Sequence, residues 1–124
     1  MKKSLMCLTV VASVVTSSNI LAHGDKPKHG GIVQASSDLS FEMVNKDHAT
    51  IIYVEDHGKK LPTTGATGKL TILNGMQKSE LPLEPAGENT LAAKGDTKLD
   101  KGAKAIASIT FADKKTVNVR FSVK

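Results

Sequence analysis

Histidine is the residue type in this chain best suited to chemistry, and two of the four histidines lie close together. His23 and His29 flank the polar segment Gly-Asp-Lys-Pro-Lys, and two glycines follow. Imidazole nitrogens bind divalent transition metals, and Cu(II) favours a tetragonal set of nitrogen and oxygen ligands. Because glycine allows the backbone to wrap around an ion, this segment predicts a metal site, for copper ion first and for zinc, nickel or cobalt as alternatives.

The ligands that this segment offers depend on where the mature chain begins. Residues 1–22 have the pattern of a secretory signal peptide, in which two lysines precede an apolar stretch over 5–15 and Ala22 ends the segment with a small residue. Cleavage after Ala22 makes His23 the N-terminal residue, so that its α-amine, with a pKa of about 8, and its imidazole can chelate one ion together. Cleavage two residues earlier places this histidine third, which is also an arrangement that binds Cu(II).

Two further side chains could complete the ligand set. Asp25 lies between the two histidines and offers a carboxylate oxygen. His48 lies in a turn between two expected strands, and if the first two strands pair as a hairpin, His29 falls at the same end of the sheet. The expected metal ligands are therefore His23, His29, His48 and Asp25.

His57, the remaining histidine, is expected to be an exposed turn residue. A strand over residues 49–55 separates it from His48, and at about 3.3 Å per residue the two histidines lie about 30 Å apart. Neither has an evident nucleophile beside it, and the carboxylates are spread over turns, where solvation explains them. We therefore expect no catalytic residues and no enzymatic activity.

The composition favours an exported protein that does not bind nucleic acids. The one cysteine, Cys7, would leave with the signal peptide, so the mature chain has no disulfide. Two of the 17 basic residues leave as well, and the excess over the 12 acidic residues falls from five to three. The other lysines are scattered and Trp is absent, whereas a nucleic-acid surface needs a basic stripe with stacking residues. We expect a periplasmic protein with no membrane insertion after cleavage.

Short alternating segments bounded by Gly, Pro, Asn and Asp predict an all-β domain. In the last segment Val117, Val119 and Phe121 face one side and polar residues face the other. Segment 49–55 is β-branched and nearly continuous, as expected of a strand buried on both faces. Pro82 predicts that its strand lies at an edge. The expected strands are residues 30–34, 39–44, 49–55, 69–73, 80–84, 90–93, 103–111 and 116–123.

This number of strands, without helical periodicity, predicts a fold class. We expect a single antiparallel β-sandwich of about seven to eight strands, immunoglobulin-like or cupredoxin-like, with a small closed barrel as the alternative. The expected divisions are a signal peptide over 1–22, a flexible histidine-containing arm over 23–31 and a β-sandwich domain over 32–124. About 100 residues remain after cleavage, enough for one core and not for two.

Five segments carry a resemblance to a known group of proteins. They are HGDKPKHGG at 23–31, FEMV at 41–44, GATGKLT at 65–71, EPAG at 84–87 and VRF at 119–121. The chain resembles small periplasmic proteins of Proteobacteria that are associated with heavy-metal efflux and copper-resistance loci. The resemblance implies a metal-linked periplasmic role, with His23 and His29 at the positions of the family's histidine arm.

The expected function is that of a periplasmic metal-binding protein. It would buffer copper ion, or deliver it to a component of a metal-efflux system, in heavy-metal resistance. The alternative comes from another class: a non-catalytic β-sandwich interaction module that docks on an envelope complex, with incidental histidines. Loss of copper binding on substitution of His23 or His29 would favour the first hypothesis.

Overall fold

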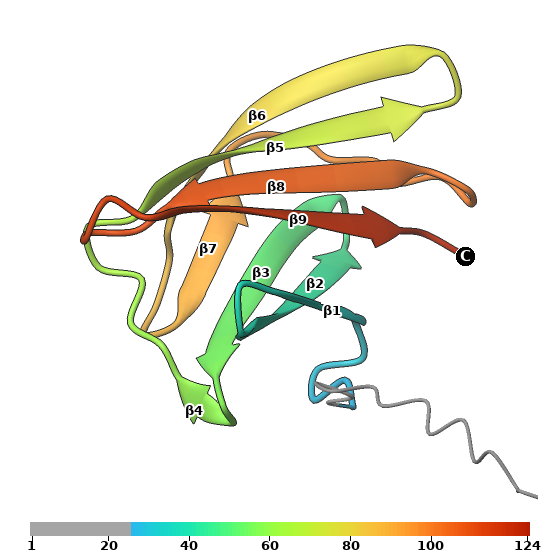
Figure 1. Ribbon diagram of the computed structural model, residues 1–124. Helices are drawn as coiled ribbons and strands as arrows, with labels where there is room; N and C mark the ends of the chain where they lie inside the picture. The colour runs from blue at the N-terminus through green and yellow to red at the C-terminus, as the bar shows by residue number, and fades with distance from the viewer. Residues whose placement is uncertain (1–25) are drawn as a thin grey trace, which may run out of the picture.

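The computed structural model describes residues 26–124, which form nine β-strands and no helix (Figure 1). All of the pairings between the strands are antiparallel. Over these residues there is no helix of the length and apolarity that a membrane crossing requires. The strands are β1 (Ile32–Ser36), β2 (Leu39–Lys46), β3 (Ala49–Asp56), β4 (Lys59–Lys60), β5 (Thr67–Asn74), β6 (Gln77–Pro85), β7 (Thr90–Ala93), β8 (Lys104–Thr110) and β9 (Thr116–Ser122).

The strands form one continuous sheet in the order β1-β2-β3-β7-β6-β5-β8-β9, and β4 pairs with β3. The sheet folds over on itself, so that the β5, β6, β8 and β9 layer lies above the β1, β2 and β3 layer (Figure 1). Its two ends meet where the Ser36 hydroxyl donates a hydrogen bond to the carbonyl oxygen of Asn118 at 2.9 Å. The fold is all-β, sandwich-like and nearly closed into a barrel, which confirms the expected fold class.

One hydrophobic core fills the space between the two layers. In β9 the inward residues Val117, Val119 and Phe121 are buried while Asn118 and Arg120 between them are exposed, as the alternation predicts. The largest fully buried apolar side chains come from both layers and are Phe41, Phe121, Met43, Ile52, Leu70, Leu83, Leu91, Ile109 and Val54.

The β3 strand is buried fully on one face only, in contrast to the expectation of two buried faces. Thr50, Ile52 and Val54 are buried, whereas Ile51 and Tyr53 on the opposite face are half-buried. The inner face lies in the core between the layers. The outer face is covered in part by the chain that precedes β1, which is where the histidine-containing segment lies.

The β6 strand is not an edge strand, although it contains Pro82. It lies between β5 and β7 in the sheet order. However, β7 pairs with β6 only from Leu83 onward, so the residues of β6 before Pro82 have β5 as their ladder partner. Pro82 thus lies where the second ladder begins, and its missing N–H donor is tolerated there.

Tight turns with positive φ place several polar side chains at the ends of the sheet. Asp38 in the β1–β2 turn has a φ of 64°, Asp47 and His48 in the β2–β3 turn have 54° and 64°, and His57 after β3 has 51°. Asn, Asp and His adopt this region more readily than most residues do. Because consecutive hairpins turn at alternate ends, His48 and His57 lie at opposite ends of β3.

Candidate functional site

The side chain of Glu42 in β2 is acidic and yet buried, and the chain before β1 covers it. The residue is 6% exposed. Its Oε2 accepts the backbone N–H groups of His29 and Gly31, both at 2.8 Å, and its Oε1 accepts the backbone N–H of Lys28 at 3.1 Å and Nδ1 of the His29 ring at 2.9 Å. These four donors offset the cost of burying a charge. We call Glu42, Lys28, His29 and Gly31 together the Glu42 clamp.

The hydrogen bonds of the clamp keep the Glu42 carboxyl ionised. Burial alone raises the pKa of this group, but the His29 ring and the backbone N–H groups of Gly31, His29 and Lys28 stabilise the carboxylate and bring its pKa below the ordinary value. An ionised carboxylate only accepts hydrogen bonds. The His29 ring must therefore donate from Nδ1.

This bond decides which nitrogen of His29 is available to a ligand. With Nδ1 protonated, the neutral imidazole carries its lone pair on Nε2. The ring stacks on Tyr53 of β3 with centroids 3.7 Å apart and planes inclined by 3°, and the His29 side chain stays 40% exposed. Metal-binding histidines commonly donate their second ring N–H to a carboxylate in this way. The arrangement thus suits a metal ligand.

Two further contacts hold the segment against the sheet. A Cβ atom at Gly31 would lie 2.3 Å from the carbonyl oxygen of Met43 and 2.8 Å from Cγ2 of Val44, so the close approach requires glycine. The Lys28 ammonium bonds both carboxylate oxygens of Glu55 at 2.9 Å. This ion pair is half-exposed and contributes little stability alone. The segment is therefore fixed on the outer face of β2 and β3 chiefly by the clamp.

His48 has a structural environment of its own in the β2–β3 turn. Its carbonyl oxygen accepts the backbone N–H of Thr97 at 2.8 Å and the hydroxyl of the same residue at 3.1 Å. Its ring Nδ1 lies 3.2 Å from Oδ1 of Asp96, and both side chains are exposed. The His48 backbone thus ties the loop after β7 to the turn.

The structure does not bring His48 to His29. The β1 strand begins at Ile32 opposite Met43, and the chain before it turns onto the face of the sheet at Glu42 instead of running on alongside β2 to the turn. From Glu42 to the end of β2 is four residues, which at about 3.3 Å each is about 13 Å. The first two strands do pair as a hairpin, but the rings of His29 and His48 contact different carboxylates, those of Glu42 and Asp96.

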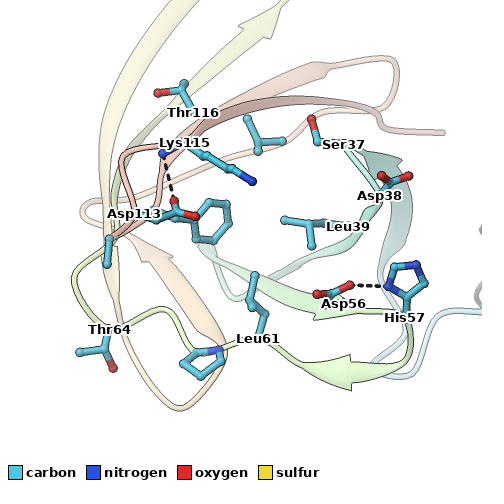
Figure 2. A pocket seen from close by; sticks show the side chains of 14 residues that line it. Ser37, Asp38, Leu39, Asp56, His57, Leu61, Thr64, Asp113, Lys115 and Thr116 are labelled. Carbon is cyan, nitrogen blue, oxygen red and sulfur yellow. Dashed lines mark hydrogen bonds and ion pairs between the residues drawn. The ribbon is translucent and has the colours of Figure 1, made fainter.

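His57 lies at the other end of the sheet, on the wall of a cleft (Figure 2). It is exposed, as expected, and its ring Nδ1 bonds the Asp56 carboxylate at 2.5 Å. The cleft has a volume of about 770 Å³ and lies between the β1–β2, β3–β4 and β8–β9 turns and the loop that follows β4. Its walls also carry Asp38 and Asp113.

The other expected features lie outside the described residues. These are His23, Asp25 and the signal peptide over 1–22. Within residues 26–124 no group of three or more His, Cys, Asp or Glu side chains is arranged to hold a metal ion. Of the four expected ligands the structure describes His29 and His48, and of these two His29 has a buried carboxylate, that of Glu42, behind its ring.

Glu42 and Tyr53 are the residues of this site that sequence patterns did not reveal. The alternation of segment 39–44 puts Glu42 on the face opposite Phe41, where a solvated carboxylate is the ordinary expectation. In the structure Glu42 is paired directly with Tyr53 across the β2–β3 ladder. The sequence does carry a signal for the clamp. It is an acidic residue opposite an aromatic residue, preceded by a His-Gly-Gly segment that can fold back.

Comparison with known proteins gives this chain no relatives. No protein-family model matches the sequence, and neither the curated proteins nor the solved structures contain a match. The chemistry of the Glu42 clamp and of the cleft is therefore the basis for what we propose below.

Proposed function

We propose that this chain is a periplasmic metal-binding protein that takes copper ion, with zinc, nickel or cobalt as alternatives, and buffers it or delivers it to a metal-efflux system. The observation that supports this most is the state of His29. Its Nδ1 donates to the buried Glu42 carboxylate at 2.9 Å, and its side chain stays partly exposed. An imidazole held in one orientation is a better ligand than a freely rotating one.

The proposed ligand set combines His29 with residues that precede it. His29 supplies Nε2, His23 supplies its imidazole and, after cleavage at Ala22, its α-amine, and Asp25 supplies an oxygen. Such a nitrogen-rich set suits Cu(II). We leave His48 out of the set, because it lies in the β2–β3 turn and its ring is beside Asp96.

Copper titration of the mature protein tests this function. The N-terminus is first identified by mass spectrometry, and binding is then followed by the Cu(II) absorption and electron paramagnetic resonance spectra. We expect His29→Ala and His23→Ala each to lower the affinity by more than tenfold. His57→Ala is the matched control, because this histidine is also exposed and also bonded to a carboxylate. If His29→Ala and His57→Ala bind copper equally well, the proposed site is wrong.

The role of Glu42 gives a second test of the same site. A carboxylate behind a metal-binding histidine contributes about 10- to 100-fold in affinity. We therefore expect Glu42→Gln to weaken copper binding by a factor in this range while His29 is still present. Copper affinity equal to that of the unaltered protein would mean that the clamp does not act on the ligand.

The second candidate function is that of an interaction module, and the β5–β6 hairpin favours it. Met76 at its tip is fully exposed, at 102%, and the residues of β6 before Pro82 have β5 as their ladder partner on one side and no strand pairing from β7 on the other. A partner that docks there should remain bound in a pull-down after addition of a chelator and after removal of the histidine-containing segment. Replacing Met76 with Ser should release it.

A further inference from the structure

The cleft beside His57 is formed by turns that are far apart in the sequence. Ser37 and Asp38 come from the β1–β2 turn, Asp56 and His57 from the end of β3, and the residues around Asp113 from the β8–β9 turn. Several of these residues have positive φ, including Asp38 at 64° and His57 at 51°. Tight turns at one end of the sheet thus form the walls of the cleft.

The floor of the cleft is apolar. Leu39, Leu61 and Phe111 line it, and all three are partly buried residues that pack against the hydrophobic core with one side. Val117, which is 5% exposed, completes this floor. Its volume of about 770 Å³ falls within the range of small-molecule sites, which are mostly apolar with a few placed polar groups.

The rim of the cleft is acidic, in contrast to the chain as a whole. Three carboxylates, those of Asp38, Asp56 and Asp113, line it together with one ammonium group, that of Lys115. The His57 ring bonds the Asp56 carboxylate, and Asp113 accepts the backbone N–H of Lys115. The full chain has a net charge of +5. Among residues 26–124 the Asp38 carboxylate has no hydrogen-bond or ion-pair partner, which leaves its charge available to a ligand. The rim thus attracts cations and repels anions.

We propose that this cleft binds an organic cation, an ammonium or guanidinium group carried on an apolar body. The apolar part would cover Leu39, Leu61 and Phe111, and the charged group would lie between the rim carboxylates. A bare metal ion fits less well, because in the described part of the chain no three acidic or histidine side chains converge on one point. A larger cation needs no direct coordination, because several nearby carboxylates attract its charge at longer range.

Lys115 supports this interpretation from within the protein. Figure 2 shows its side chain extending over the cleft between the Asp113 side and the Asp38 side. Its ammonium group therefore lies near the carboxylates that would attract the positive charge of a bound ligand. A ligand cation would compete with this group, so removal of the Lys115 charge should strengthen binding.

The test uses three probes of nearly the same shape and different charge: phenethylamine, phenethyl alcohol and hydrocinnamate. Each is titrated into the metal-free protein while backbone amide chemical shifts are followed by NMR. We expect saturable shifts at the cleft residues, with the amine bound more tightly than the alcohol and the alcohol more tightly than the carboxylate. Since no metal is present, failure here leaves the His29 proposal untouched, and the reverse also holds.

Charge variants make the test specific. Asp38→Asn should weaken amine binding by about two- to fivefold, the worth of one exposed ion pair, and Lys115→Met should strengthen it by a similar factor. Asp47→Asn is the matched control, since Asp47 has a similar positive φ of 54° in a turn at the other end of the sheet. Asp113→Asn replaces Asp38→Asn if the latter does not fold. Equal binding of the three probes, or shifts away from the cleft, or no saturable shift, would overturn the proposal.

Discussion

The Glu42 clamp makes a prediction about stability that involves no metal. The perturbation is Glu42→Gln, which keeps the shape of the side chain and removes its charge. The carboxylate accepts four hydrogen bonds, two at each oxygen. Glutamine offers one oxygen, and its amide NH₂ group must then face two N–H donors.

The size of the effect follows from those four bonds. A hydrogen bond to a charged group contributes about 1.5–3 kcal/mol, and two of the four are lost. Part of this loss is offset, because a charge no longer has to be buried. The loss is also limited, because the segment before β1 can detach and leave the core intact. We expect the free energy of unfolding to fall by about 2 kcal/mol, which lowers Tm by roughly 10 °C.

Limited trypsin digestion measures the detachment directly. In the segment before β1 the described lysines are Lys26 and Lys28. Trypsin does not cleave readily between Lys26 and Pro27, so the bond between Lys28 and His29 reports on the opening of this segment. Both N–H groups beside it donate to Glu42, and cleavage requires that the segment open first. Because the cleavage rate follows the open population, a change of about 2 kcal/mol makes cleavage about 30-fold faster.

A control and a refuting result complete this prediction. Glu88→Gln removes an exposed carboxylate whose nearest cationic partner, Lys60, is 4.0 Å away, and it should change stability by less than about 0.5 kcal/mol. If Glu42→Gln leaves both Tm and the rate of cleavage after Lys28 unchanged, the clamp does not hold the segment and our reasoning is refuted.

Three further predictions concern acid, close packing and the core. The folded pKa of Glu42 lies below its unfolded value of 4.5, so its contribution to stability is complete above that pH and is lost as the pH falls through the folded pKa. Urea unfolding between pH 3 and 7 should show this fall in the free energy of unfolding, and Glu42→Gln should reduce it. Gly31→Ala should also expose the bond after Lys28 to trypsin, since the new Cβ meets the Met43 carbonyl; unchanged protection would contradict the close approach. Phe121→Ala should cost about 3–5 kcal/mol in denaturant unfolding because its side chain is fully buried, whereas Met76→Ser at the hairpin tip should change stability by less than about 0.5 kcal/mol.

The sequence by itself determined where most of the strands lie and that three histidines, His29, His48 and His57, stand outside them. Alternation of apolar and polar residues is a local signal, and in β9 it assigned Val117, Val119 and Phe121 to the core correctly. Turn residues are also local, and they placed His48 and His57 between strands. Pro82 misled, because a missing N–H excludes a residue from one ladder bond and not a whole strand from the sheet interior.

Only the tertiary structure decided which side chains meet. The order of the sheet, in which β3 pairs with β7 and β5 with β8, depends on contacts that no local pattern encodes. The same holds for the clamp, where the segment around His29 folds back onto Glu42 13 residues later, and for the cleft, whose walls come from three separate turns. A buried carboxylate is stable only where hydrogen-bond donors surround it, and which donors reach it depends on the folded arrangement of the chain.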